Sequence, residues 1–292
     1  MDRRRFLASL ALLLSGCMPK SSGLTVGSKN FTEQLVLGEL LAQYLARFTP
    51  APIDRRFYLA GTYICHQALL AGRIDMYVEY TGTALVAILK EKPVSDHAAV
   101  FNTVKDLYSR RFGLEVLPSL GFDNTFAMVM RGNDARRLRL KTLSDVAAIS
   151  SQLRLGVGYE FLERPDGYPG LAAKYGFKFA ETPRVMDLGL LYRALQNNQV
   201  DIVAGSNTDG LIAALDLVVL EDDRHYFPPY DAVPIVRRAT LERHPEIAAA
   251  LQKLSGRIKA DDMRRMNYAV DGEKKDAALV VKDFLLRQPF RV

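Results

Sequence analysis

Four side chains have the types and positions needed to bind a small charged molecule. Lys29 follows a predicted strand and a glycine turn at the start of a helix, where free backbone N–H groups and the ammonium group can hold an anion. Arg164 lies in a turn-rich loop, and its guanidinium can bind a carboxylate with two hydrogen bonds. Tyr80 ends a strand and Tyr230 follows two prolines, and rings held in this way offer π faces to quaternary ammonium groups, at ~0.5–2 kcal/mol per contact. The four residues predict a site for a zwitterion, with a carboxylate at one end and a cation without N–H donors at the other.

Each of these residues also has an ordinary structural interpretation. Lys29 could be a surface lysine, and Arg164 could form a salt bridge with Glu163 or Asp166. The two tyrosines could simply pack in the core. The residues alone do not decide between these readings.

The sequence does not predict an enzyme. The histidines at positions 66, 97, 225 and 244 lack the spacing of a metal site, and there is no nucleophile elbow, phosphate-binding loop or complete dinucleotide fingerprint. Cys65 and His66 are neighbours on a predicted helix and point about 100° apart, so adjacency alone does not make them a nucleophile and its base. We interpret Cys65 as a small core residue and His66 as partly exposed. We expect no catalytic residue, no cofactor and no metal.

Strands alternate with helices along the chain, a pattern typical of parallel sheets covered by helices on both faces. The first elements are a strand over 24–26, a helix over 32–48 with apolar residues at a period near 3.6, and a strand over 53–59. In such sheets ligands bind beyond the carboxyl ends of the strands. The loops of interest are therefore 27–31, 80–83, 158–167 and 205–209.

An internal echo indicates two related halves. Residues 68–83 read ALLAGRIDMYVEYTGT and residues 194–209 read ALQNNQVDIVAGSNTD, with the same step from alanine to Asp75 and to Asp201. A weaker echo relates LTVGSK, from residue 24, to LRLGVG, from residue 153. The matched spacing favours two related α/β lobes over a coincidence between ordinary units.

The length of 292 residues fits about two domains. Two extended stretches, 125–130 and 231–236, lie between the halves in sequence, and we interpret them as crossovers. Lobe one is then predicted to comprise 24–123 and 227–292, with lobe two, 124–226, inserted into it. The tail from residue 240 is predicted to be helical and to pack back on lobe one.

The N-terminus resembles an export signal. Residues 1–16 hold a basic start and a short apolar stretch, which is typical of a signal peptide and too short for a stable membrane span. The sequence Leu-Ser-Gly before Cys17 resembles a bacterial lipoprotein box, which implies cleavage before Cys17, lipid on that cysteine and a tether over 17–23. An ordinary signal peptide with an incidental cysteine is the alternative, and both general and twin-arginine export stay open.

The formal charge of +6 does not indicate a nucleic-acid partner. Removing residues 1–16 takes away three arginines and one aspartate, which leaves +4 spread over the chain. The short basic clusters lack interleaved aromatic residues, so we expect solvated surface charge and no nucleic-acid contact. With Cys17 as the anchor, Cys65 has no partner for an intramolecular disulfide.

Four motifs occur together in the order of a known family. They are GSKNFTEQ at 27–34, VEYTGT at 78–83, RPDG at 164–167 and PPYDA at 228–232. The chain thereby resembles the substrate-binding lipoproteins of ABC importers for glycine betaine, choline, carnitine and related osmoprotectants, from residue 25 to about 284. The resemblance implies the two-lobed, type II periplasmic-binding-protein fold with two crossover strands and a ligand cleft.

The resemblance also implies roles for seven residues. Lys29, Thr83 and Arg164 match positions that hold the ligand carboxylate. Tyr80 and Tyr230 match two positions of the aromatic cage around the trimethylammonium group. The family pattern has tyrosine at two further cage positions. This chain has Phe126 at the first, which keeps a π face, and Ser206 at the second, which has no ring. Ser206 follows Asp201 as Tyr80 follows Asp75, so the two residues are expected on facing walls.

The family implies an extracytoplasmic receptor that binds a quaternary ammonium osmoprotectant by cleft closure and delivers it to ABC permease subunits in the membrane. We expect a lipid-anchored monomer on the periplasmic or cell-surface side of the cytoplasmic membrane. Two alternatives stay open: a ligand-sensing module of the same fold, and a receptor for a bulkier zwitterion because the aromatic cage is incomplete.

Overall fold

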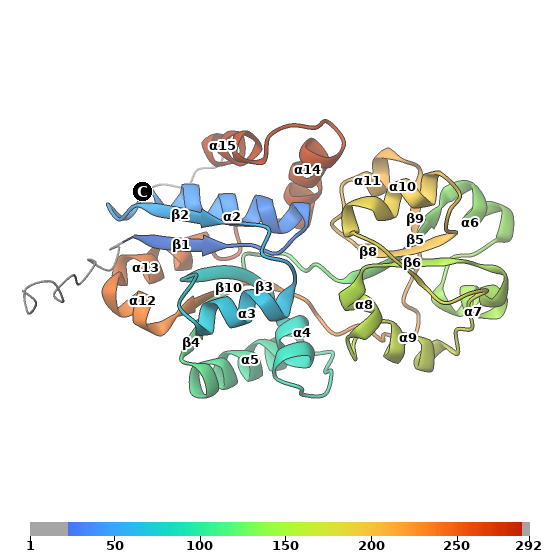
Figure 1. Cartoon of the computed structure of the whole chain (residues 1–292), viewed down its shortest axis with the longest axis horizontal. Coiled ribbons are helices and arrows are strands. Elements are labelled where there is room, and N and C mark those ends of the chain that lie inside the picture. The colour runs from blue at the N-terminus through green and yellow to red at the C-terminus, as the bar shows by residue number, and fades with distance from the viewer. Residues whose placement is uncertain (1–22, 288–292) are drawn as a thin grey trace, which may run out of the picture.

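The computed structural model describes residues 23–287, which form two lobes joined by two extended segments (Figure 1). Each lobe contains one five-stranded sheet, with the order β2-β1-β3-β10-β4 in lobe one and β7-β6-β8-β5-β9 in lobe two. The predicted α/β fold with two lobes is confirmed. The predicted signal peptide and Cys17 lie outside the described residues, and the residue-level lobe boundaries stay a prediction.

Lobe one is built from both ends of the described chain. Its strands are β1 (Leu24–Gly27), β2 (Ile53–Arg56), β3 (Met76–Tyr80), β4 (Leu114–Val116) and β10 (Ala232–Arg237). Its first helices are α2 (Thr32–Leu45), α3 (Thr62–Leu70), α4 (Thr81–Thr83), the π-helix η1 (Ala84–Ile88) and α5 (His97–Phe112). The later ones are α12 (Arg238–Arg243), α13 (Pro245–Leu254), α14 (Ala260–Asp271) and α15 (Ala277–Arg287).

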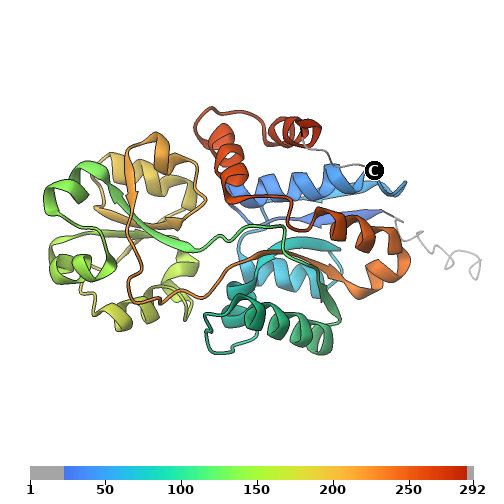
Figure 2. The same cartoon turned by 180° about the vertical axis from the view of Figure 1, so that it is seen from behind.

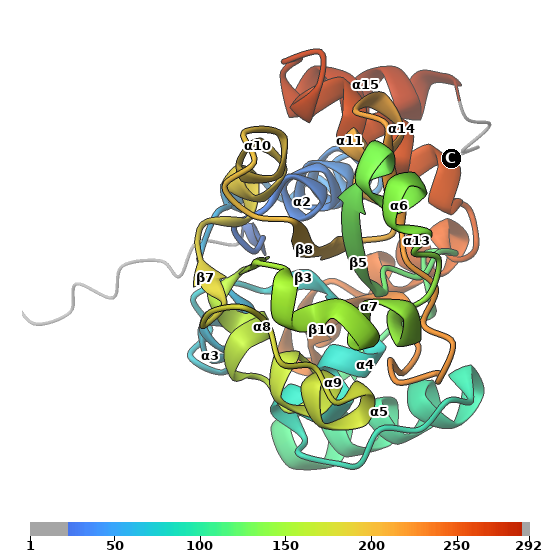
Figure 3. The same cartoon turned by 90° about the vertical axis from the view of Figure 1, so that its right-hand side faces the viewer.

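Lobe two lies between these two parts in sequence. Its strands are β5 (Phe126–Arg131), β6 (Leu155–Val157), β7 (Arg184–Val185), β8 (Ile202–Ser206) and β9 (Leu217–Val219). Its helices are α6 (Gly132–Leu138), α7 (Leu143–Ile149), η2 (Ser150–Gln152), α8 (Tyr159–Glu163), α9 (Tyr168–Tyr175), η3 (Leu188–Leu190), α10 (Leu191–Gln196) and α11 (Leu211–Ala214). Figure 3 looks at this lobe from its outer end, with α10 on one side of the sheet and α7 to α9 on the other.

Helix α2 is the central helix of lobe one. Its apolar residues, including Leu37, Leu40 and Leu41, are fully buried between the sheet and the C-terminal helices α13 to α15. The predicted tail that packs back on lobe one is therefore confirmed. The helix ends at Leu45, earlier than predicted, and the chain passes through a turn at 46–48 before Pro50, which disfavours helical backbone at Thr49. No helix within residues 23–287 has the length and apolar character to cross a membrane.

The prediction of parallel sheets is only partly right. Strand β1 runs parallel to β2 and β3, but β10 runs antiparallel to β3 and β4. Likewise β6 is parallel to β7 and β8, whereas β5 is antiparallel to β8 and β9. Strands β5 and β10 each enter a lobe from the other one, so they start at the end of the sheet where β3 and β8 finish. The direction of the crossover thus makes both sheets mixed.

The internal echo corresponds to equivalent structure in the two lobes. The backbone N–H of Thr25 donates to Asp75 Oδ2 at 2.9 Å, and the N–H of Arg154 donates to Asp201 Oδ2 at 2.9 Å. In return, the N–H of Asp75 donates to Thr25 O at 2.7 Å, and that of Asp201 donates to Arg154 O at 2.8 Å. Asp75 therefore ties the start of β3 to β1, and Asp201 ties the start of β8 to β6 in the same way. The prediction of related lobes is confirmed by these contacts and by the equivalent positions of β1 and β6, β3 and β8, and β10 and β5 in the two sheets.

The two extended connections run side by side between the lobes (Figure 2). Asp123 and Asp231 form an isolated antiparallel bridge there, and Asp123 Oδ2 accepts a hydrogen bond from the N–H of Tyr230 at 2.5 Å. His97, at the start of α5, lies 2.8 Å from Asp231 through its Nδ1. Two paired, short connections allow the lobes to rotate about one axis, the geometry of a hinge.

Cys65 and His66 are both core residues. Cys65 is fully buried, as predicted, and burial raises its pKa to about 12, so it is a thiol at neutral pH. His66 is 4% exposed, so the expectation of partial exposure was wrong. Its ring packs edge-on against Tyr108 and Phe112, and burial lowers its pKa. The sequence did not reveal this because the covering helix α5 lies far away along the chain.

We predict that Asp201→Asn destabilises the fold at neutral pH. Burial alone would raise the pKa of Asp201, but hydrogen bonds from Arg154 and Arg131 lower it to about 2. A lowered folded-state pKa contributes stability that is present above the unfolded pKa and is lost as pH falls through the folded value. Denaturant unfolding should show a loss of ~1–2 kcal/mol at pH 7, shrinking towards zero by about pH 2.

The matched control is Asp216→Asn, which removes an exposed carboxylate paired with Arg136 in the same lobe. This variant should unfold almost as the wild type does. Equal unfolding free energies for Asp201→Asn and wild type at pH 7 would contradict the structural role of the repeated aspartate.

Candidate functional site

A cavity of about 450 Å³ lies between the lobes, beyond the carboxyl ends of β1, β3, β6 and β8. All seven residues predicted to bind ligand line it: Lys29, Tyr80, Thr83, Phe126, Arg164, Ser206 and Tyr230. They come from both lobes and from the segments that connect them. Its size falls within the ~300–1,000 Å³ of sites for small organic ligands. The structure therefore brings all the predicted residues to one place.

Lys29 is a buried cation. It follows β1, is 3% exposed, and donates from Nζ to Thr62 Oγ1 at 2.9 Å. It also forms an ion pair with Glu79, which lies on β3 and is completely buried. The surface-lysine interpretation is therefore wrong. The ammonium is neutralised within its own lobe and lies 5.1 Å from the centre of the Tyr80 ring.

Arg164 is the second buried cation, at 3% exposure, and it comes from lobe two. Its Nε and Nη2 donate to the two oxygens of Asp166 at 2.9 and 2.5 Å, so the salt bridge that the sequence left open does form. Nη2 also donates across the cleft to Thr83 Oγ1 at 3.1 Å. Burial disfavours the guanidinium cation, but Asp166 raises the pKa of Arg164 above its ordinary value. Among residues 23–287 its Nη1 makes no hydrogen bond, so that nitrogen is available to a ligand.

Aromatic rings occupy the middle of the cavity. The Phe126 and Tyr230 rings meet edge to face with centroids 5.5 Å apart, and the Tyr230 hydroxyl donates to Asp166 at 2.8 Å. The Arg164 guanidinium lies 5.2 Å from the centre of the Phe126 ring. Phe126 is paired in register with Ser206, which places the ringless position directly beside it.

Sequence reasoning missed two further rings that line the cavity. Phe31 stacks on Tyr80 with centroids 6.5 Å apart, and Phe161 meets Phe126 edge to face at 4.9 Å. Their positions in the sequence could have predicted both as site residues. Phe31 lies in the first motif, close to Lys29, and Phe161 begins the segment that carries Arg164. The aromatic surface is thus larger than the cage positions alone suggested.

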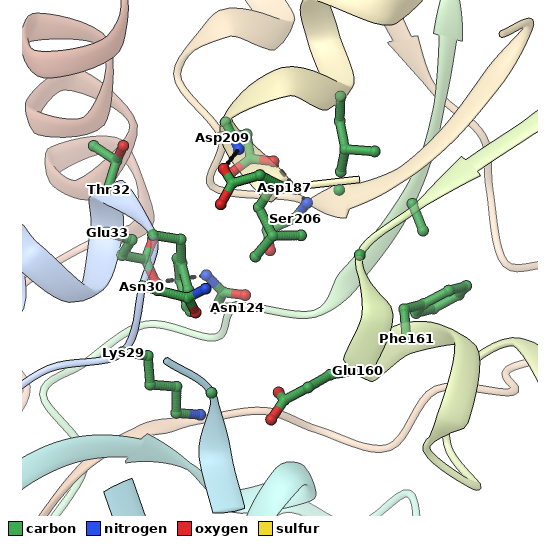
Figure 4. Close-up of a pocket in the computed structure, with 18 of the residues that line it drawn as sticks. Lys29, Asn30, Thr32, Glu33, Asn124, Glu160, Phe161, Asp187, Ser206 and Asp209 are labelled. Atoms are coloured by element: carbon green, nitrogen blue, oxygen red, sulfur yellow. Dashed lines mark hydrogen bonds between the residues drawn. The ribbon is translucent and has the colours of Figure 1, made fainter. Parts of the chain in front are cut away.

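The far end of the cavity is rich in hydrogen-bond acceptors (Figure 4). Glu33 Oε1 accepts from the Tyr80 hydroxyl at 2.6 Å and from Asn124 Nδ2 at 2.5 Å, and Glu33 Oε2 accepts from Asn267 Nδ2 at 3.0 Å. Asp209 accepts from the Tyr192 hydroxyl and from the N–H of Ser206, at 2.5 and 2.8 Å. Glu33 and Asp209 were not among the residues predicted from the sequence to bind ligand.

Neither of these two carboxyl groups forms an ion pair among the residues described, and the exposed Lys274, which also lines the cavity, acts on Asp271. Burial raises the pKa of Glu33, and its hydrogen bonds from Thr208, Tyr80, Asn267 and Asn124 only partly oppose this. Burial also raises the pKa of Asp209 to about 7, against the hydrogen bonds from Tyr192 and Ser206. Lys29 and Arg164, by contrast, each have a carboxylate partner. The cavity is therefore polar at both ends, with cations at one and acceptors at the other.

The comparisons agree with this geometry. Residues 22–287 match the family model described as the substrate binding domain of the ABC-type glycine betaine transport system. The carnitine transport binding protein OpuCC of Listeria monocytogenes is 33% identical over 97% of this chain and 94% of its own length. A solved structure described as a glycine betaine/carnitine/choline ABC transporter is 34% identical, with a TM-score of 0.76 over 91% of this chain and 99% of that one. The fold is thus that of the type II periplasmic binding proteins.

One relative is described by a different ligand. The ergothioneine transport permease/ergothioneine binding protein EgtU of Helicobacter pylori is 36% identical over 96% of this chain. The match covers 50% of that relative, so this chain corresponds to about half of it.

We predict that Asp209→Asn becomes more stable than the wild type as pH rises. A carboxyl whose folded-state pKa is about 7 keeps its proton in the folded protein after the unfolded chain has lost it. The wild type therefore loses stability between about pH 4 and pH 7, whereas an asparagine does not titrate. The measurement is the unfolding free energy of both proteins at intervals from pH 4 to pH 8.

For comparison, Arg136 lowers the pKa of the exposed Asp216, so the small difference between Asp216→Asn and the wild type should be constant above about pH 4 and should change only on the acid side of it. A difference between Asp209→Asn and wild type that stays constant from pH 4 to pH 8 would show that Asp209 titrates normally.

Proposed function

The chain belongs to the family of substrate-binding domains of ABC-type glycine betaine transport systems, and we propose that it is an extracytoplasmic receptor for a zwitterionic quaternary ammonium compound. Members of this family bind a small solute and deliver it to the permease of an ABC importer. The observation that carries the proposal is the convergence of two buried cations and several aromatic rings, from both lobes, on one cavity.

The ligand carboxylate would lie at the end of the cavity that holds Lys29, Thr83 and Arg164. The free Nη1 of Arg164 supplies a charge-assisted hydrogen bond, and the Lys29 ammonium adds attraction at short range. The trimethylammonium group would then contact the rings of Tyr80, Phe126 and Tyr230. A group without N–H donors gains from such π faces without losing hydrogen bonds, which favours a quaternary centre there.

Ligand binding would favour the closed arrangement of the lobes. The cavity walls come from both lobes, and the lobes already touch through Arg164 with Thr83 and through the N–H of Thr62, which donates to Glu160 at 2.7 Å. A ligand that contacts both walls stabilises closure through its additional contacts in that state. The paired connections at Asp123 and Asp231 would serve as the hinge.

The cavity favours a ligand bulkier than glycine betaine. Ser206 leaves one side of the cage without a ring, and the volume of about 450 Å³ exceeds what so small a molecule fills. Relatives of similar identity are described as binding proteins for carnitine and for ergothioneine, both larger betaines. We propose the same class of ligand here.

The N-terminus supports delivery at a membrane. We propose that residues 1–16 are removed as a signal peptide, that Cys17 carries the lipid anchor and that 17–23 form the tether to a monomeric receptor. Lobe one would comprise 24–123 with 227–292, and lobe two 124–226. The closed receptor would then dock on the permease subunits in the membrane.

Calorimetry with the purified protein tests the proposal. We expect binding of at least one of glycine betaine, carnitine, choline and ergothioneine, with the two larger zwitterions preferred, and small-angle scattering should show compaction with each ligand that binds. Uptake by cells with and without the gene separates a transport receptor from a sensor. Binding of none of the four compounds, or binding without compaction, would refute the receptor proposed here.

We predict that Ser206→Tyr strengthens glycine betaine binding about fivefold, because one added cage face is worth ~1 kcal/mol. The control is Ser95→Tyr, which adds the same ring at an exposed position outside the cavity. Calorimetric titration of both variants and the wild type measures the effect. No gain in a folded Ser206→Tyr protein would show that residue 206 does not face the quaternary ammonium group.

A further inference from the structure

The acceptor end of the cavity contains a buried oxygen without a hydrogen-bond donor. Asn267, on α14, is 2% exposed and lines the cavity, and its Oδ1 has no hydrogen-bond partner among residues 23–287. Leaving such an oxygen unpaired costs about 1–3 kcal/mol, so a buried amide of this kind normally finds a donor. The unpaired oxygen therefore points to a missing donor in the cavity.

The orientation of this amide follows from its neighbours. Asn267 Nδ2 donates to Glu33 Oε2 at 3.0 Å and to the carbonyl oxygen of Thr208 at 3.0 Å. A backbone carbonyl can only accept, so the nitrogen must face Thr208 and the oxygen must face the other way. The unpaired atom is thus an acceptor, whichever protonation state Glu33 adopts.

Other acceptors surround Asn267 at the same end. Glu33 Oε1 accepts from Tyr80 and Asn124, its Oε2 accepts from Asn267, and Thr208 also hydrogen-bonds to this carboxyl group. Asp209, beyond Ser206, lines the same cavity and accepts from the Tyr192 hydroxyl and the Ser206 N–H on Oδ2. Among residues 23–287 neither Glu33 nor Asp209 forms an ion pair, and the exposed Lys274, which also lines the cavity, acts on Asp271.

The aromatic rings separate this end from the cations. The Tyr80 ring has Lys29 5.1 Å from its centre, while its hydroxyl donates to Glu33. Phe126 likewise has Arg164 near its ring and Ser206 beside its backbone. A zwitterion with its carboxylate at the cations and its quaternary centre among the rings would extend any further substituent towards Glu33, Asn267 and Asp209.

We propose that Glu33, Asn267 and Asp209 form a subsite for a hydrogen-bond donor of the ligand, so that the cognate solute is a betaine carrying an N–H group beyond its carboxylate and quaternary ammonium. The subsite rests on the receptor function proposed above and specifies its class of substrate. A trimethylammonium group alone does not meet the need of these oxygens, because it has no N–H donor. Glycine betaine would leave the subsite unpaired and bind weakly for that reason.

Histidine betaine and its ring-N-methylated form provide a matched test on the wild-type protein. Both carry a carboxylate, a trimethylammonium group and an imidazole ring, but in the neutral ring only the first has an N–H. We expect calorimetry to show at least tenfold tighter binding of histidine betaine. Equal affinity for the two compounds would overturn the subsite and leave the receptor function intact, whereas failure of every betaine to bind would overturn both.

Glu33→Gln tests the residue assignment. This variant replaces a carboxylate acceptor with an amide, and we expect the discrimination between the two compounds to fall below about threefold. The control is Glu39→Gln, which changes a buried glutamate on the same helix that pairs with Arg55 outside the cavity, and it should keep the wild-type ratio. A wild-type ratio in folded Glu33→Gln would remove Glu33 from the subsite, and Asn267→Leu provides the same readout if the first variant does not fold.

Discussion

The site depends on keeping charge balanced in a space from which water is largely excluded. Burying an unpaired ion is costly, and each cation in the cavity has a carboxylate partner from its own lobe, Lys29 with Glu79 and Arg164 with Asp166. The lobes can therefore separate without leaving either charge unpaired. A ligand carboxylate then binds beside two ion pairs that already exist. Its favourable contribution to the binding free energy comes from the donors that are still free and from its contact with both walls at once.

The repeated architecture of the lobes places unlike residues at equivalent positions of the cavity. Asp75 and Asp201 hold equivalent strands in place, and those strands end at Tyr80 and Ser206. The same spacing relates Thr83, beside Arg164, to Asp209, among the acceptors. At these equivalent positions lobe one presents a tyrosine and a threonine and lobe two presents a serine and an aspartate. A symmetric fold with unlike residues at equivalent positions produces a cavity suited to a ligand with unlike ends.

Much of this arrangement was accessible from the sequence because it depends on local features. Tyr80 and Ser206 end strands β3 and β8 and Arg164 follows the short helix α8 after β6, and the carboxyl ends of such strands gather at one edge of a sheet. The echo predicted that Ser206 corresponds to Tyr80, and the two residues do end equivalent strands. The acceptor end was not accessible, because Glu33 gains its character from Asn124, Asn267 and the loop at Thr208, which meet only when the C-terminal helices fold back. The burial of His66 was missed because the covering helix α5 lies far away along the chain, and the end of α2 because the apolar period continues to Phe48, beyond Leu45.

The carboxyl groups at the acceptor end are held by neutral hydrogen-bond donors. Burial raises the pKa of Glu33 and raises that of Asp209 to about 7, because it penalises their charged forms. Asn124 and Asn267 add donors that are neutral at every pH, so Glu33 is held in place without an ion pair. A buried lysine or arginine paired with Glu33 or Asp209 would satisfy these carboxyl groups permanently and would take space that a ligand needs. Using amides and hydroxyls in its place keeps the oxygens oriented and still available.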